Sequence, residues 1–91
     1  MNIDEILAER KKTHGNFKDQ ARASQRLKST LVSEIKADAP YTATQREALE
    51  MICHKIARIV AGDPDFADHW RDIAGYATLV ADELEAKNGE K

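Results

Sequence analysis

Apolar residues recur at spacings of three and four along most of the chain, the period of one face of an α-helix. Four such segments can be distinguished, at about residues 3–13, 17–36, 44–61 and 65–87. No segment alternates apolar and polar residues for long enough to predict a strand. The pattern predicts an all-α fold of four helices in a single domain over residues 1–87, with a frayed tail at residues 88–91.

Residues that favour helix ends lie at the borders of these segments. The pairs Asn2 with Glu5 and Thr44 with Glu47 have the spacing of a capping box, and Asn16 can cap the second segment. The predicted helix stops are Gly15, which is free to adopt a positive φ, then Pro40 and Gly62. Only a few residues separate the third and fourth segments, so we expect these two to form a long antiparallel hairpin.

The apolar stripes are long for so short a chain. The stripe of the third segment is centred near Ile56 and that of the fourth near Ala77, and the third also contains Cys53 as a small core residue. The expected core includes Phe17, Ile59, Val60, Phe66, Trp70, Ile73, Ala74, Val80, Ala81 and Leu84. Because a chain of 91 residues buries a limited core, we expect a homo-oligomer, a dimer or larger, to complete the bundle.

Composition and charge narrow the class of protein. No run of about 18 apolar residues predicts a membrane span, the N-terminus lacks the apolar region of a signal peptide, and the single cysteine fits a cytoplasmic protein. The net charge is −2. A basic row, Lys18, Arg22 and Arg26, could follow phosphates or form a solvated helix face. The second interpretation is favoured, so nucleic acid is not an expected partner.

Charged residues border the apolar stripes of the expected hairpin. When the two helices are projected at about 100° per residue, Asp68, Asp72 and Tyr76 lie toward one edge, and Lys55 and Arg58 lie toward the facing edge. This edge is either a polar pocket for an anion or a metal, or a salt bridge beside the core. Gly75 leaves the neighbouring outer face bare, which would let a ligand or another subunit approach.

A second group of candidate metal ligands lies on the third segment. Glu47, Glu50 and His54 share one face and have spacings that could bind a divalent ion. That face is opposite the apolar stripe, so a solvated face is the competing interpretation.

Two segments resemble a known family. HKIARIVAGDPDFADHWRDIAGYATLVADEL resembles small phage- and prophage-encoded proteins that are distantly similar to MazG-like all-α nucleoside triphosphate pyrophosphohydrolases, and RKKTHGNF resembles their Arg-x-x-x-Tyr-Gly segment. The resemblance implies Asp68 and Asp72 as catalytic residues and Gly15, Lys55, Arg58 and Tyr76 as ligand-binding residues. It also implies Mg²⁺, with Glu47, Glu50 and Asp72 as the nearest counterparts of its ligands, although the chain lacks the family's Glu-Glu pair.

Two functions follow as hypotheses. The first is the binding or Mg²⁺-dependent hydrolysis of a nucleoside triphosphate to the monophosphate and pyrophosphate. The second is a non-catalytic oligomeric module that binds a nucleotide or a host protein. The incomplete set of metal ligands leaves the question of catalysis open.

Overall fold

The computed structural model describes residues 2–89 and confirms the all-α fold. Its four helices are α1 (Ile3–His14), α2 (Phe17–Glu34), α3 (Ala43–Ala61) and α4 (Ala67–Lys87). Of the predicted tail, Asn88 and Gly89 continue the hydrogen bonding of α4, with Asn88 N–H donating to Leu84 and Gly89 N–H to Ala86, and residues 90–91 lie outside the described residues. No helix within residues 2–89 has both the length and the apolar character needed to cross a bilayer.

Side-chain caps explain where three of the helices begin. The predicted capping box of Asn2 and Glu5 is confirmed, and Asn16 accepts a hydrogen bond from Lys18 N–H at the start of α2. The capping box predicted at Thr44 and Glu47 is wrong, because Thr42 and Gln45 form it two residues earlier. Thr42 lies directly after the Pro40-containing loop, where the chain still has the extended conformation that an N-cap requires.

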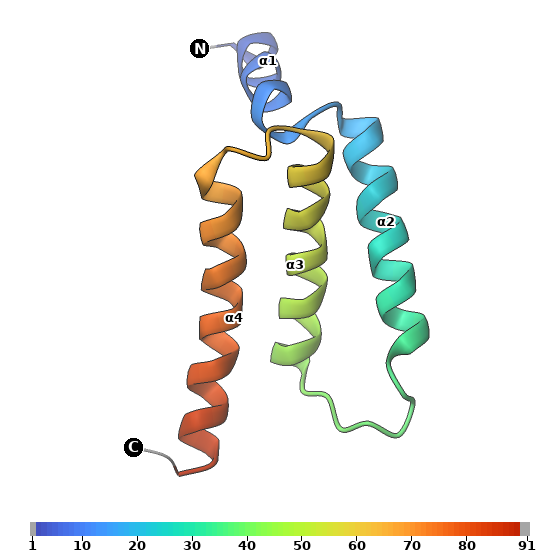
Figure 1. Ribbon diagram of the computed structural model, residues 1–91, viewed down its shortest axis with the longest axis vertical. Helices are drawn as coiled ribbons and strands as arrows, with labels where there is room; N and C mark the ends of the chain where they lie inside the picture. The colour runs from blue at the N-terminus through green and yellow to red at the C-terminus, as the bar shows by residue number, and fades with distance from the viewer. Residues whose placement is uncertain (1, 90–91) are drawn as a thin grey trace.

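Three of the helices form one flat layer. In Figure 1, α3 lies between α2 and α4, and the three helices run in alternating directions. Within residues 2–89, α3 contacts both neighbours while α2 and α4 do not contact each other. The antiparallel hairpin of α3 and α4 is therefore confirmed. Helix α1 crosses one end of this layer and contacts α2 and α3 near its own C-terminus.

The core is small and partly polar. The buried apolar residues are Ala48, Ala57 and Ile59, and the buried polar residues are Gln20, Ser24, Lys55 and His69. Three large residues expected in the core are instead exposed, Phe17 at 75%, Val60 at 67% and Trp70 at 54%, and so are Ala74 and Ala81. On α4, helix rotation turns His69 inward in place of Trp70. On α2, Phe17 lies on the same face as the buried Ser24, two turns away, but it is the first residue of the helix and stays exposed.

Candidate functional site

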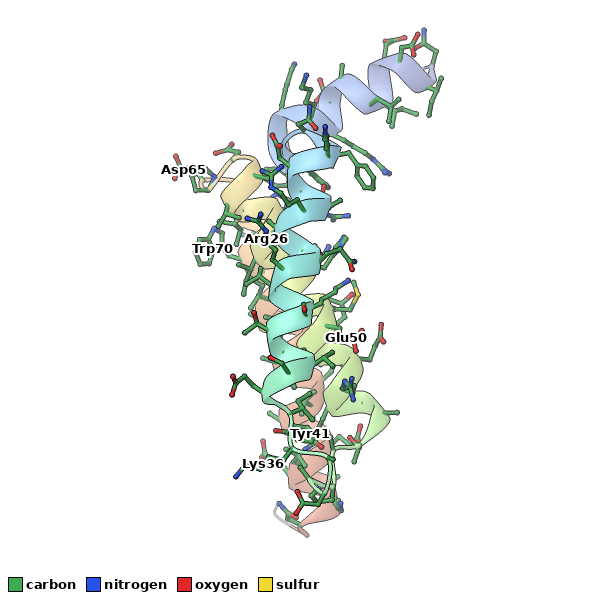
Figure 2. The ribbon with its side chains drawn as sticks, turned by 90° about the vertical axis from the view of Figure 1, so that its right-hand side faces the viewer. Arg26, Lys36, Tyr41, Glu50, Asp65 and Trp70 are labelled. Atoms are coloured by element: carbon green, nitrogen blue, oxygen red, sulfur yellow. The ribbon has the colours of Figure 1, made fainter. Side chains whose placement is uncertain are left out.

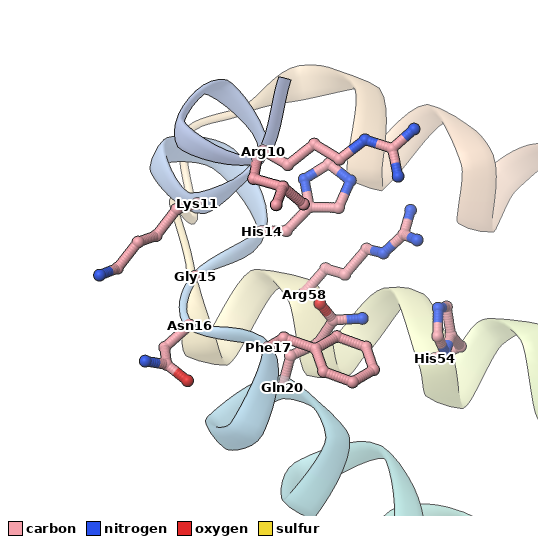
Figure 3. Close-up of a pocket in the computed structure, with 10 residues that line it drawn as sticks. Arg10, Lys11, His14, Gly15, Asn16, Phe17, Gln20, His54 and Arg58 are labelled. Atoms are coloured by element: carbon pink, nitrogen blue, oxygen red, sulfur yellow. The ribbon is translucent and has the colours of Figure 1, made fainter. Parts of the chain in front are cut away.

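A pocket of about 350 Å³ lies where the end of α1, the start of α2 and the last turns of α3 meet. Most of the residues that line it are basic or polar, and Figure 3 shows Arg10, His14, Gln20 and Arg58 around the junction of three helices. The residues that carry the argument are Arg10 and His14 of α1, Phe17 and Gln20 of α2, and His54 and Arg58 of α3. No aspartate or glutamate is among the residues that line it.

The junction under this pocket depends on two glycines whose backbones touch. Gly15 has φ of +82°, and a Cβ atom built there would lie 2.0 Å from the carbonyl oxygen of Ala61. A Cβ atom on Gly62 would lie 2.3 Å from the carbonyl oxygen of Thr13. That carbonyl accepts a hydrogen bond of 3.0 Å from the Asp63 N–H. The α1–α2 turn and the α3–α4 turn can therefore meet only because neither glycine has a side chain.

A buried histidine of α4 holds the same carbonyl. His69 is 1% exposed, and its Nε2 lies 2.8 Å from the Thr13 carbonyl oxygen. A carbonyl can only accept, so Nε2 carries the proton and donates it. The His69 ring also makes edge-to-face contacts with His14 and Phe66, each with 4.9 Å between ring centroids. His69 thereby links α4 to the end of α1 and helps to position His14, the residue that follows Thr13.

Two guanidinium groups face the pocket without an acidic partner. Arg10 and Arg58 extend in the same direction in Figure 3, whereas Lys11 points away. Neither arginine takes part in any ion pair within the described residues. Burial, followed by the charge of Arg10, lowers the pKa of Arg58, while Asp72 and Tyr76 oppose that shift. The proximity of like charges is unfavourable, and a bound anion would relieve it.

The Nε atom of Arg58 is buried and has no hydrogen-bond partner. One other such atom occurs in residues 2–89, Arg46 Nε, but it lies 3.3 Å from a carboxylate oxygen of Glu50. A buried donor without an acceptor costs free energy, which makes the position of Arg58 costly in the free protein. An anion in the pocket could supply the missing acceptor.

His14 lies beside these cations and is held in its neutral form. Its Nδ1 is 2.6 Å from the hydroxyl oxygen of Thr13. Burial, and then the charges of Arg58, His69, Lys55 and Arg10, lower the pKa of His14 to about 4. The pKa of His54 is also lowered, first by burial and then by Arg58, Lys28 and Lys55. The positive charges near the pocket therefore add to burial in lowering the pKa of both of its histidines.

The edge between α3 and α4 contains the ion pair that the helical projection suggested. Lys55 Nζ lies 3.0 Å from a carboxylate oxygen of Asp72, and the Lys55 side chain is only 11% exposed. The hydrogen bond and charge of Lys55 lower the pKa of Asp72. Asp68 pairs with Arg71 on its own helix. Of the two interpretations of this edge, the structure provides the salt bridge, and ligand or catalytic roles for Asp68 and Asp72 stay predictions.

The remaining predicted site residues are dispersed. Gly75 and Tyr76 line a shallow groove with Asp72, and the space beside Gly75 is open, as expected. Glu47 lies in another groove near Tyr76, and Glu50 pairs with Arg46. No three His, Cys, Asp or Glu side chains of residues 2–89 are close enough to hold a metal ion. Glu47, Glu50 and Asp72 thus form no three-ligand site in one copy of this part of the chain.

Other candidates behave as ordinary structural residues. Arg22 of the basic row pairs with Asp19 on the exposed face of α2. Burial raises the pKa of the Cys53 thiol, which keeps it protonated and poorly nucleophilic. These observations agree with the structural interpretations of the basic row and of Cys53.

Sequence reasoning identified part of the pocket. Gly15 and Arg58 were expected as ligand-binding residues, and both line it. Arg10, which lines the pocket, and His69, which bonds to Thr13 beneath it, were not among the predicted site residues. Arg10 is the first residue of the Arg-x-x-x-His-Gly segment, and this motif could have identified it as a candidate. No sequence pattern identifies His69, because its hydrogen-bond partner Thr13 is 56 residues away along the chain.

Comparison with known proteins places the chain in a family. No curated protein and no solved structure matches it. Residues 3–84 match the family described as "Domain of unknown function (DUF6378)", a match that includes all four helices but for the last turn of α4. The chain, with its pocket at the α1–α2 and α3 junction, belongs to the DUF6378 family.

Proposed function

We propose that this protein binds a nucleoside triphosphate with the phosphates in the pocket of Arg10, His14 and Arg58. The observation that carries this proposal is the pair of guanidinium groups that share a pocket without an acidic residue, one of them with a buried and unpartnered Nε. Guanidinium groups match the geometry of phosphate oxygens, since they can donate two hydrogen bonds at once.

The rest of the pocket suits a nucleoside better than a bare phosphate. Phe17 lines it and is 75% exposed as a residue, so its ring offers a surface on which a base can stack. Gln20 of the same pocket carries an amide that can both donate and accept hydrogen bonds. The sequence resemblance to phage and prophage proteins that are distantly similar to MazG-like enzymes is what favours a triphosphate as the ligand.

Hydrolysis of the ligand is a separate proposal. The acidic residues do not assemble a three-ligand metal site in one copy of the described chain, so the residues do not fit Mg²⁺ as they stand, and we derive no catalytic step through it. The expectation that Asp68 and Asp72 act with Mg²⁺ is tested by pyrophosphate release from nucleoside triphosphates. Release that Asp72→Asn abolishes in folded protein would support it, and no release with Mg²⁺ or Mn²⁺ would exclude it.

Binding is tested by calorimetric titration with ATP and with inorganic triphosphate. We expect Arg58→Gln and Arg10→Gln to weaken ATP binding at least about tenfold, because each removes a charge-assisted contact. Arg71→Gln is the matched control, since it removes the same charge from an exposed arginine paired with Asp68 outside the pocket. Equal loss in all three variants, or no binding by the wild-type protein, would overturn the proposal.

The alternative function is a non-catalytic oligomeric module that binds a nucleotide or a host protein. It is favoured by the single layer of helices, which leaves apolar side chains such as Val60 and Trp70 exposed. We propose homo-oligomerisation under either function, and a cytoplasmic location because Cys53 is the only cysteine in the sequence.

A further inference from the structure

The centres of the apolar stripes of α3 and α4 point out of the layer on the same side. On α3, Lys55 pairs with Asp72 of α4, and the buried Ala48 and Ile59 lie on the same side of the helix as Lys55. The Nδ1 of His54 lies 3.5 Å from the Ser24 hydroxyl of α2, and the buried Ala57 lies on that side, nearly opposite Ala48. By helical spacing, Leu49, Ile56 and Val60 lie between these directions. On α4, Val80 lines the grooves on both sides of the contact with α3, whereas Ala77 lines only one of them, and Trp70 and Ala81 lie on the same face as Ala77 by helical spacing. A groove of about 330 Å³ lined by Leu49, Ile52 and Ala77 shows that both stripes open onto one face.

The two sides of the layer are therefore unlike. We call the side that carries Leu49, Ile56, Val60, Trp70 and Ala77 the apolar face. Figure 2 shows Trp70 on one side of the layer and Glu50 on the other, with α1 leaning toward the Glu50 side. The pocket of Arg10 and Arg58 uses α1 and lies away from the apolar face.

The exposed area exceeds what a compact chain of this size shows. The accessible surface is 6633 Å² for a mass of 10.2 kDa. A folded monomer of that mass is expected to expose roughly 5300 Å². The excess is larger than the roughly 800 Å² that each partner buries in a standard stable interface. A helical layer that is apolar on one side is completed by a second layer packed against it.

The charges of the outer helices indicate what the second layer is. Helix α2 carries four basic and two acidic residues, whereas α4 carries two basic and five acidic residues, of which Asp68 and Asp72 pair with Arg71 and Lys55 within one copy. The complementarity is therefore between the net charges of the two helices, positive for α2 and negative for α4. Arg26 and Lys36 lie on the Trp70 side of the molecule in Figure 2. Another copy of this chain, turned by a two-fold axis parallel to α3, would place its basic α2 over the acidic α4. The other face-to-face two-fold arrangement would place α4 over α4 and bring like charges together.

We propose that the apolar face is a homodimer interface, in which a second copy packs α3 over α3 and α2 over α4 and leaves both Arg10–Arg58 pockets on the outer sides. The dimer buries Val60, Trp70 and Ala77, which explains why the sequence places apolar residues where one copy leaves them exposed. Dimerisation and ligand binding then use opposite sides of the layer. The inference does not depend on the proposed nucleotide.

The test is the mass in solution of two matched variants, measured by light scattering at micromolar concentration. Val60 and Leu79 are aliphatic residues with similar exposure, 67% and 63%, but Leu79 lines the grooves on the opposite side, with Tyr76. The wild-type protein and Leu79→Lys should both have twice the mass of one chain, whereas Val60→Lys should have the mass of one chain. A monomeric wild-type protein, or loss of the dimer in both variants, would overturn the proposal.

Two controls distinguish loss of the dimer from unfolding of the variant and from loss of ATP binding. Circular dichroism must show that Val60→Lys keeps its helices; if it unfolds, Ala77→Glu replaces it, because Ala77 is already exposed in one copy. A folded monomeric variant should still bind ATP as the wild-type protein does. If Arg58→Gln loses ATP binding but stays dimeric, the result supports the nucleotide proposal and leaves the dimer proposal unaffected. If the wild-type protein is a stable dimer that binds no ATP, the nucleotide proposal is wrong and the dimer proposal stands.

The packing of α3 over α3 in the proposed dimer can be tested by cysteine cross-linking. In a Cys53→Ser background, Val60→Cys should form an interchain disulfide under oxidation, because the two α3 helices run parallel across the two-fold axis. Ala77→Cys should not, because the two α4 helices lie on opposite sides of the dimer. The reverse result would contradict this packing.

Discussion

At the scale of the residue, Gly15 and Gly75 differ in whether the fold could accept a side chain at that position. Gly15 has φ of +82° and ψ of −177°, a region that essentially only glycine occupies, and its α-carbon faces the backbone of Ala61. Gly75 lies within α4 and a Cβ atom there would meet nothing within 4 Å. The sequence predicted the positive φ of Gly15 from its place after a helix, but it could not show that a second backbone lies against it.

We predict opposite effects for the two alanine variants. Gly15→Ala should destabilise the protein by at least about 2 kcal/mol, because it combines backbone strain with a clash. Gly75→Ala should stabilise it by about 1 kcal/mol through helix propensity. Chemical denaturation measures both values. Similar small effects in the two variants would show that the close contact of the two turns is absent.

His14 makes stability depend on pH. The pKa of His14 is lowered from 6.5 to about 4 in the folded protein, so between these values the unfolded chain binds more protons at this site. The free energy of unfolding should therefore rise with pH across this window, and it should fall as the pH is lowered from 6.5 to 4. His14→Gln should weaken this dependence. An NMR titration that finds the folded His14 ring with a pKa near 6.5 would contradict the prediction.

At the scale of the element, the sequence predicted the four helices and the α3–α4 hairpin well, because apolar periodicity and capping residues are local signals. It also led to the Lys55–Asp72 pair, since both residues border their stripes. It failed on the rotation of α4, where His69 is buried while Trp70 is exposed, and on Gln20 of α2, which is buried although it is not in the predicted stripe. Rotation depends on which side of each helix meets a neighbour, and that information is not local.

The start of α3 offers a test on this scale. Thr42 accepts a hydrogen bond of 3.0 Å from Gln45 N–H, whereas Thr44 lies within the first turn and caps nothing. Thr42→Ala should therefore cost about 1 kcal/mol of stability, and Thr44→Ala should have almost no effect. Thermal or chemical denaturation of the two variants compares them directly. A larger loss for Thr44→Ala would place the helix start two residues later.

At the scale of the whole molecule, the flat layer separates two kinds of surface. One side carries Val60, Trp70 and Ala77, which are exposed in one copy, and the other carries the pocket under α1 together with the exposed Leu79. The sequence indicated that the chain is too short for a full core, and it supplied Gly15 and Arg58 as ligand-binding candidates. It could not indicate that Arg10 and Arg58 share a pocket, because they are brought together only when the two glycine turns meet.

The most direct test of the nucleotide site is a ¹H–¹⁵N NMR titration of the intact protein with ATP. We expect saturable shifts of the backbone amide signals of Gly15, Asn16, Phe17 and Arg58. These shifts should be lost in Arg58→Gln but kept in Arg71→Gln. Shifts confined to Asp72, Gly75 and Tyr76 on the α3–α4 edge, or no shifts at millimolar ATP, would contradict it.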